Sequence, residues 1–372
     1  MAHLFEPLAL RGLTLPNRIM VSPMCQYSAS DGNATAWHQA HLGSLALGGA
    51  GMLCLEATAV SREGRITSGC LGLWSDENEA ALAGVLRTLR AASPMKLAIQ
   101  LSHAGRKASS AAPWDGGQLV AVEEGGWQPL APSALPQKPE EPLPRALTVA
   151  DLDRIKADFV QAAKRAVGLG FDAIELHGAH GYLLHQFLSP IANQRDDQYG
   201  GSLESRMRYP LEVFDAVRAV VPDAIPVGVR LSATDWVDDE PSWTLDQTVE
   251  LGMRLKDKGV DWLDVSSGGV SHRQRIPVGP GYQVHLAEAV KREVGVPTVA
   301  VGLITEAGQA QAIVADDRAD MIAVGRGMLY NPRWAWHAAA ELGGKVQGPP
   351  QYWRSLPSGK SAVFGNITFG MR

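Results

Sequence analysis

The chain has few cysteines, and their spacing suits neither a metal site nor a disulfide framework. Cys25, Cys54 and Cys70 are odd in number and contain no C-x-x-C pair. This argues against structural zinc, an iron–sulfur cluster and a small disulfide-stapled scaffold. We expect no bound metal, and so few cysteines fit a reducing compartment, which predicts a cytoplasmic protein.

Long apolar runs and an excess of positive charge are also lacking. No uninterrupted apolar run approaches the roughly 18 residues of a membrane-spanning helix. Lys plus Arg is 34 and Asp plus Glu is 39, which gives a formal net charge of −5. Because no basic run offers a footprint for a phosphate backbone, we expect neither nucleic acid nor a membrane as a partner. With 45% hydrophobic and 20% charged residues over 372 positions, the chain can bury a large core.

Eight short, apolar, β-branched runs recur along the chain, with helix-length amphipathic segments between several of them. This alternation predicts a parallel sheet covered by helices, and eight repeats favour a closed (β/α)8 TIM barrel in the α/β class. A doubly wound sheet is the alternative, but no G-x-G-x-x-G fingerprint follows any of the runs. The predicted strands are Arg18–Ser22, Ala50–Val60, Lys96–Leu101, Asp172–His177, Pro226–Leu231, Trp262–Ser266, Thr298–Val301 and Met321–Val324. The predicted helices are Leu152–Leu169, Leu203–Val221, Leu245–Lys258, Val284–Val294 and Thr305–Ala315, with Thr148 and Thr305 as caps.

Two segments interrupt this rhythm within what we predict to be a single domain over residues 1–372. The first, at about 106–147, is rich in proline and glycine and contains Trp114 and Trp127. It follows the third strand, so we expect an ordered cap over the catalytic face of the barrel. The second is a C-terminal tail at about 343–372, whose prolines argue against a further helix. We expect this tail to pack elsewhere, with another subunit as one alternative.

Polar side chains follow the fourth strand, where a barrel places its functional residues. His177 and His180 would need further ligands to bind a metal, whereas two neutral imidazoles can donate hydrogen bonds to one substrate oxygen. A purely structural role at the strand end is the alternative. Tyr182 is a candidate proton donor, although a tyrosine can equally be packed with its hydroxyl satisfied.

Glycines at the ends of the last two strands indicate a phosphate site. Gly302 and Gly325 let backbone amides approach a phosphate, and Arg326 adds a charged donor. The pattern does not separate a phosphorylated substrate from a phosphate-bearing cofactor, and tight turns explain the glycines as well. Cys25, judged alone, is an inert small hydrophobe.

Five separated motifs resemble the old yellow enzyme family of FMN-dependent ene-reductases. They are SPMCQY at 22–27, EATAV at 56–60, QLSHAGRKA at 100–108, HGAHGYLLHQFLSP at 177–190 and NQRDDQYGGSLESRMR at 193–208. The resemblance runs from Leu4 to about Trp336. Cys25 and the His-x-x-His pair resemble the thermophilic-like branch, which includes the xenobiotic reductases. The chain lacks the cysteines and the length of the family's larger iron–sulfur reductases.

The resemblance implies FMN as cofactor and NADPH, or NADH, as hydride donor. The implied reaction passes hydride from flavin N5 to the β-carbon of an unsaturated carbonyl or nitro compound, with Tyr182 protonating the α-carbon. Cys25 is implied to tune the flavin potential. The implied cofactor-binding residues are Ser22, Pro23, Met24, Cys25, Ala57, Gln100, Arg230, Gly302, Gly325 and Arg326. The implied substrate-binding residues are Tyr27, His177, His180, Tyr182 and Arg354.

The resemblance also implies a homodimer or homotetramer, in which Arg354 of the tail reaches a neighbouring subunit's site. Adjacent Trp353 is an alternative, and the tail beyond Ser355 is longer than the branch would suggest. Two other functions stay open at this point. A flavin-free barrel lyase or isomerase would use Lys107 or Glu56 as its base on a phosphorylated substrate, and a flavin- or nucleotide-binding sensor would have no turnover.

Overall fold

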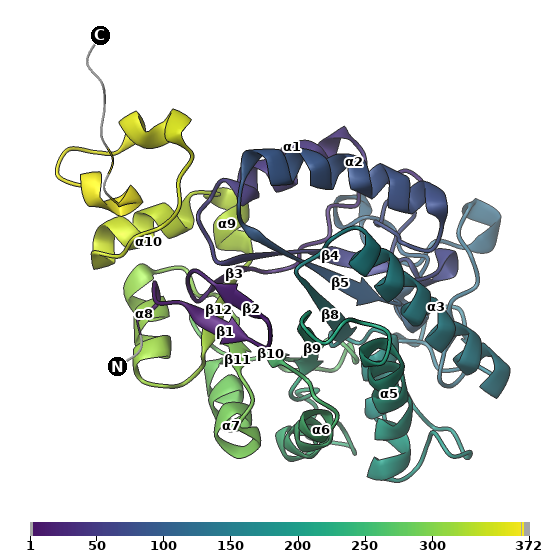
Figure 1. Ribbon diagram of the computed structural model, residues 1–372. Helices are drawn as coiled ribbons and strands as arrows, with labels where there is room; N and C mark the ends of the chain where they lie inside the picture. The colour runs from purple at the N-terminus through teal and green to yellow at the C-terminus, as the bar shows by residue number, and fades with distance from the viewer. Residues whose placement is uncertain (1–2, 366, 368–372) are drawn as a thin grey trace.

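Eight parallel strands close into a barrel in the computed structural model, which describes residues 3–365 and 367 (Figure 1). The order around the barrel is β10-β11-β12-β3-β4-β5-β8-β9. The strands are β3 (Ile19–Val21), β4 (Met52–Ala59), β5 (Lys96–Ser102), β8 (Ala173–Gly178), β9 (Val227–Ser232), β10 (Trp262–Ser266), β11 (Thr298–Ala300) and β12 (Met321–Val324). The predicted TIM barrel is confirmed, and each predicted strand corresponds to one of these eight. Continuous burial along the barrel strands β4, β9 and β12 explains why their runs are apolar on both faces.

Helices surround the barrel. They are α1 (Ala36–Ala46), α2 (Asp76–Ala92), α3 (Val149–Gly168), α4 (Leu183–Leu188), α5 (Leu203–Arg218), α6 (Leu245–Asp257), α7 (Val284–Val294), α8 (Ala307–Ala315), α9 (Arg326–Tyr330) and α10 (Trp334–Leu342). The five predicted helices correspond to α3, α5, α6, α7 and α8, whereas the amphipathic α2 was not predicted. Thr148 caps α3 as predicted, because its side chain accepts from the Asp151 N–H. The predicted Thr305 cap is wrong. Its hydroxyl donates to the Glu306 carboxylate instead, and Glu306 is the N-cap of α8.

The N-terminal end of the barrel is closed by a hairpin of β1 (Leu8–Leu10) and β2 (Leu13–Leu15). Its leucines pack with the side chains that fill the barrel interior, including Met20, Met52 and Trp262. Gly228 permits this filling, since a Cβ there would lie 2.0 Å from the Trp262 ring. The opposite, C-terminal end is therefore where a ligand can enter.

The proline-rich segment after β5 crosses the C-terminal end of the barrel. Within it, β6 (Leu130–Ala131) pairs with β7 (Arg145–Ala146). Arg106 donates to the carbonyl of Val270, 2.6 Å away, which fastens the segment to the loop after β10. The Trp114 ring lies 5.7 Å from the ring of Tyr27, edge to face. The segment thus reaches the loop after β3, where part of the site was predicted.

The tail folds beside α10 of its own chain as two short 3-10 turns, Pro350–Ser355 and Ser361–Phe364 (Figure 1). The ring of Trp336 in α10 contacts Phe364 at 4.9 Å and Tyr352 at 6.0 Å between centroids. Within the described part of the chain, no helix has both the length and the apolar character needed to cross a membrane.

Candidate active site

His177 and His180 come together where β8 ends. Atom Nδ1 of His177 accepts a hydrogen bond from the Ala179 N–H at 3.3 Å, so the proton of this neutral ring belongs on Nε2. That Nε2 lies 3.4 Å from Nδ1 of His180. On its other side, Nε2 of His180 is 2.7 Å from the Ser266 hydroxyl. The pair is thus the middle of a polar chain that runs from β8 to β10.

Both imidazoles are neutral near pH 7. Burial, with a smaller contribution from the positive charge of Arg230, holds the pKa of each ring well below its usual range. Tyr182 is half-buried beside them, its ring 4.9 Å from that of His177. Burial raises the pKa of this phenol well above its usual range, so Tyr182 keeps its proton. The site can therefore donate hydrogen bonds and hold a proton without carrying charge on these three groups.

His180 has a left-handed backbone conformation, with φ of 58°. The turn is pressed against the loop after β10, since a Cβ on Gly269 would lie 2.4 Å from the backbone of His180. Such a conformation costs free energy in a non-glycine residue and persists only where the surroundings enforce it. The contact with Gly269 and a hydrogen bond from the His180 N–H to the Ser232 hydroxyl (2.9 Å) supply that constraint.

Lys107 is a residue of this site whose role here was not predicted. Its ammonium donates to the carbonyl oxygens of His180 (2.9 Å) and Gly269 (3.3 Å), so it joins the two loops. It also lies 4.9 Å from the centre of the Tyr182 ring. Burial lowers the pKa of Lys107 to about 8. Lys107 belongs to the motif QLSHAGRKA, but its role could not be predicted because the carbonyl groups that it binds are distant in sequence.

A buried network of charged and polar groups lies inside the barrel beneath this turn. Arg230 of β9 donates to the Ser22 hydroxyl at 3.3 Å, and its Nε is 3.2 Å from Asp264. Glu175 accepts from Gln100 at 2.8 Å and from the indole of Trp262 at 3.1 Å. Burial raises the pKa of Glu175 to about 8. Glu175 and Asp264 were missed because each is a single acid in an apolar strand.

The remaining predicted binding residues lie at neighbouring strand ends. Ala57 follows an irregularity in β4 and pairs with Gln100 of β5. Gly302 follows β11 with φ of 125°, a value that favours glycine. Gly325 follows β12, and a Cβ there would meet only Met24 and Ser22, at 3.5 Å or more. Arg326 begins α9 directly after it.

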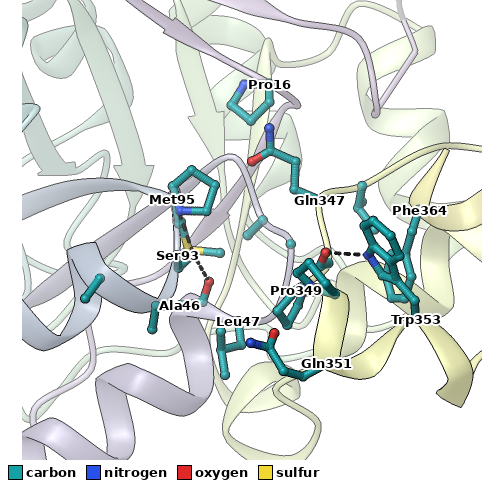
Figure 2. Close-up of a pocket in the computed structure, with 18 residues that line it drawn as sticks. Pro16, Ala46, Leu47, Ser93, Met95, Gln347, Pro349, Gln351, Trp353 and Phe364 are labelled. Carbon is teal, nitrogen blue, oxygen red and sulfur yellow. Dashed lines mark hydrogen bonds between the residues drawn. The ribbon is translucent and has the colours of Figure 1, made fainter. Parts of the chain in front are cut away.

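Arg354 is not brought together with these residues. It is exposed in the turn Pro350–Ser355 of the tail. Figure 2 shows the cavity of about 500 Å³ beside this turn, with Trp353 on its wall and the Trp353 indole donating to the carbonyl of Gly348. The cavity also touches Ala50 and Met95, which precede β4 and β5. The tail is therefore at the N-terminal end of these strands, opposite the histidines.

Comparison with known proteins decides the family. The profile of the NADH:flavin oxidoreductase / NADH oxidase family matches residues 3–343. The chain belongs to this family. It is 46% identical over 359 residues to "NADH:flavin oxidoreductase FG08077" of Gibberella zeae, covering 92% of this chain and 86% of that protein. It is 44% identical over 356 residues to the NADPH dehydrogenase of Geobacillus thermodenitrificans, covering 94% and 98%.

Solved structures agree with this assignment. Morphinone reductase superposes with a TM-score of 0.76 at 32% identity, covering 94% of this chain and 92% of that one. The protein is thus an NAD(P)H:flavin oxidoreductase of the old yellow enzyme type, as the sequence motifs predicted. The flavin-free lyase alternative is wrong on this ground, and its candidate bases are otherwise engaged. Lys107 binds two carbonyls, and Glu56 is 3.3 Å from His38.

Proposed function

We propose that the protein is an FMN-dependent ene-reductase of the thermophilic-like branch, with NADPH as hydride donor and an activated alkene as substrate. One observation carries the proposal: two neutral imidazoles, 3.4 Å apart, lie beside a protonated tyrosine at the open end of a flavin-oxidoreductase barrel. Bound FMN would supply a hydride at N5. The chain's own residues would hold the flavin, bind the alkene's oxygen and deliver a proton.

The residues present fit a flavin. Arg230 is a buried cation that donates to the Ser22 hydroxyl, where it would stabilise negative charge on the reduced ring. Its charge is paired with Asp264, whose Oδ2 lies 3.2 Å from the Arg230 Nε. Gly302, Gly325 and Arg326 would receive the phosphate, because glycines lack the Cβ that would hinder its close approach to the backbone and Arg326 supplies a charged donor. Pro23, Met24 and Cys25 would lie along the ring, between Ser22 and Tyr27, with Ala57 and Gln100 beside it.

Ser266 gives the histidine pair two hydrogen-bonding states. When Nε2 of His180 donates to Ser266, Nδ1 of His180 is free to accept from His177, and the pair is satisfied internally. When the Ser266 hydroxyl instead donates to Nε2, the proton of His180 lies on Nδ1 and faces the N–H of His177. Two donors that face one position require an acceptor there. The carbonyl or nitro oxygen of the substrate would fill that position.

The same donors would accelerate the reaction. Negative charge grows on the substrate oxygen as hydride arrives at the β-carbon, so hydrogen bonds from His177 and His180 strengthen in the transition state. Tyr182 retains its proton and lies against His177, so it is placed to protonate the α-carbon. Tyr27, with Trp114 against its ring, would form a wall of the substrate pocket.

We further propose a homodimer or homotetramer in which Arg354 serves a neighbouring subunit. Arg354 and Trp353 lie on the tail, at the opposite end of the barrel from their own histidine pair. Contact between this tail and a site therefore requires a second copy of the chain.

The experiment that tests the function is an absorbance spectrum of the purified protein, with release and identification of the chromophore and anaerobic titration with NADPH. We expect oxidised-flavin bands from FMN that bleach with NADPH and return on addition of a cyclic enone. Bleaching without return would contradict the ene-reductase assignment and leave only flavin reduction. A sensor without turnover would show no sustained NADPH consumption with the enone.

A further inference from the structure

Two of the three cysteines lie on neighbouring segments at the edge of the proposed flavin site. Cys25 is half-buried and Cys70 is fully buried, and the interaction between their thiols raises the pKa of Cys25 and lowers the pKa of Cys70. The backbones around them touch as well. The N–H of Ala29 donates to the carbonyl of Gly69 at 2.8 Å, and a Cβ on Gly69 would lie 2.5 Å from the carbonyl oxygen of Tyr27. The two sulfurs are therefore held together by the fold of both segments.

The turn that carries Cys70 favours a thiolate. Sγ of Cys70 accepts from the Thr67 N–H at 3.3 Å and lies 3.5 Å from the Thr67 hydroxyl. Buried Arg65 binds the carbonyl of Ser68 in the same turn at 3.3 Å, which brings a fixed positive charge close to the sulfur. Interaction with the Cys25 thiol and the hydrogen bonds from Thr67 lower the pKa of Cys70. A thiolate is the form of cysteine that reacts with peroxides and disulfides.

Cys54 provides an internal contrast. It is buried among the side chains that fill the barrel interior, and its thiol donates to the carbonyl of Leu55 at 3.7 Å. Burial raises the pKa of Cys54 well above its usual range. Its environment thus has neither the donors nor the partner sulfur that Cys25 and Cys70 share.

We propose that Cys25 and Cys70 are a redox pair that hydrogen peroxide converts into a reversible intramolecular disulfide. The Cys70 thiolate attacks one peroxide oxygen, the O–O bond breaks, and the products are a sulfenic acid on Cys70 and hydroxide. The second thiol then attacks the sulfenic sulfur, so an S–S bond forms, the S–O bond breaks, and the thiol proton leaves with the oxygen as water. Two thiols are oxidised by two electrons and peroxide is reduced by two. A dithiol reverses the reaction by exchange.

The disulfide would change the position and the protonation of the Cys25 sulfur at the proposed flavin site. Its sulfur would lose the S–H proton and move toward the Thr67 turn, away from the face that Ser22 to Tyr27 present to the site. The effect on the flavin rests on the proposed function, whereas disulfide formation itself does not. The two can therefore be tested separately.

The test uses the whole wild-type holoprotein, treated with hydrogen peroxide, alkylated with and without prior dithiothreitol, and mapped by peptide mass spectrometry. We expect one crosslinked species that joins the Cys25 and Cys70 peptides with the loss of two hydrogen atoms. Dithiothreitol should restore both thiols, while Cys54 stays reduced throughout. The proposal is overturned if both cysteines remain alkylatable, or if Cys25 gains oxygen atoms without forming the crosslink.

Cys70→Ser is the matched variant. It should retain flavin, and Cys25 should stay reduced under the same peroxide treatment, because the thiolate that attacks peroxide is absent. The flavin potential should differ between the dithiol and disulfide forms of the wild type and should be insensitive to dithiothreitol in Cys70→Ser. A wild-type potential that is equal in both forms overturns the link to the flavin. A colourless protein that still forms the crosslink would contradict the proposed function and leave the redox pair intact.

Discussion

The ammonium group of Lys107 donates a hydrogen bond to the backbone carbonyl of His180, 2.9 Å away, while it also binds the carbonyl of Gly269. It thereby joins the turn after β8 to the loop after β10. Lys107 is a positioning residue in this arrangement. It acts on the imidazole of His180 by fixing the backbone that carries it.

Replacing Lys107 by Met should slow alkene reduction. A buried charge-assisted hydrogen bond is typically worth about 1.5–3 kcal/mol, so we expect a loss of roughly tenfold or more in the alkene half-reaction. Reduction of the flavin by NADPH should change less, because it does not use the His180 donor. Stopped-flow measurement of both half-reactions checks this, and an equal loss in both would contradict the positioning role.

The same variant should change the pH dependence of stability. Lys107 has a pKa of about 8 in the folded protein, below the value of about 10.4 expected in the unfolded chain. The unfolded state therefore binds more protons between these values, and the free energy of unfolding should rise with pH across this range. Denaturant unfolding at pH 8 and 10 should show that the rise is smaller in Lys107→Met than in wild type.

Removing the imidazole of His180 should slow alkene reduction much more than flavin reduction, and this difference should exceed that in Lys107→Met. For His180→Ala we expect about a hundredfold slower alkene reduction, since a donor to developing negative charge is typically worth about 3 kcal/mol. Rapid mixing of reduced enzyme with an enone measures this step. A comparable slowing of flavin reduction by NADPH would show that His180 does not act mainly on the alkene's oxygen.

Ser266→Ala tests whether the hydroxyl sets the protonated nitrogen of His180. Without a hydroxyl that can donate to Nε2, His180 should less often present an N–H to the substrate, and the alkene half-reaction should slow by about fivefold to tenfold. Ser267→Ala is the control, because Ser267 bonds the same Gln283 without contacting His180. Equal slowing of the alkene half-reaction by the two substitutions would mean that both act through Gln283, and not through the protonated nitrogen of His180.

Tyr182→Phe removes the proposed proton donor and keeps the ring against His177. We expect slower turnover with carbonyl-activated alkenes, and a smaller effect with nitroalkenes, whose anionic product can be protonated after release. Steady-state rates with one substrate of each kind test this. Unchanged turnover with both would mean that solvent supplies the proton.

Glu175→Gln should change the pH dependence of the free energy of unfolding in the opposite direction to Lys107→Met. The carboxyl of Glu175 has a pKa raised to about 8, so the folded state binds more protons than the unfolded state between about 4.3 and this value. The wild-type free energy of unfolding should therefore fall as pH rises through that range. Glu175→Gln should show a flatter profile in denaturant unfolding from pH 5 to pH 8, and an unchanged slope would assign the titration to another group.

The barrel was predictable from the sequence because buried parallel strands are continuous apolar runs. The same property hid Glu175 and Asp264, whose importance comes from partners on other strands. Helix α1 was not predicted, since its apolar residues are spread around the helix, and α4 is only six residues long. The histidine pair was evident from its spacing. Contacts between distant segments, such as Lys107 with Gly269 and Cys25 with Cys70, leave no local pattern to find.

The left-handed backbone of His180 also limits how this enzyme can diverge. Among non-glycine residues, that conformation is adopted most readily by Asn, Asp and His. Only Asn and His in this group offer a neutral N–H donor, so an exchange between them would preserve both the turn and its hydrogen bond. Substitution by a β-branched residue would instead strain the loop at the position that binds the substrate. Substitutions that change the substrate range are thus tolerated more easily at Tyr27 or in the proline-rich segment after β5 than at this turn.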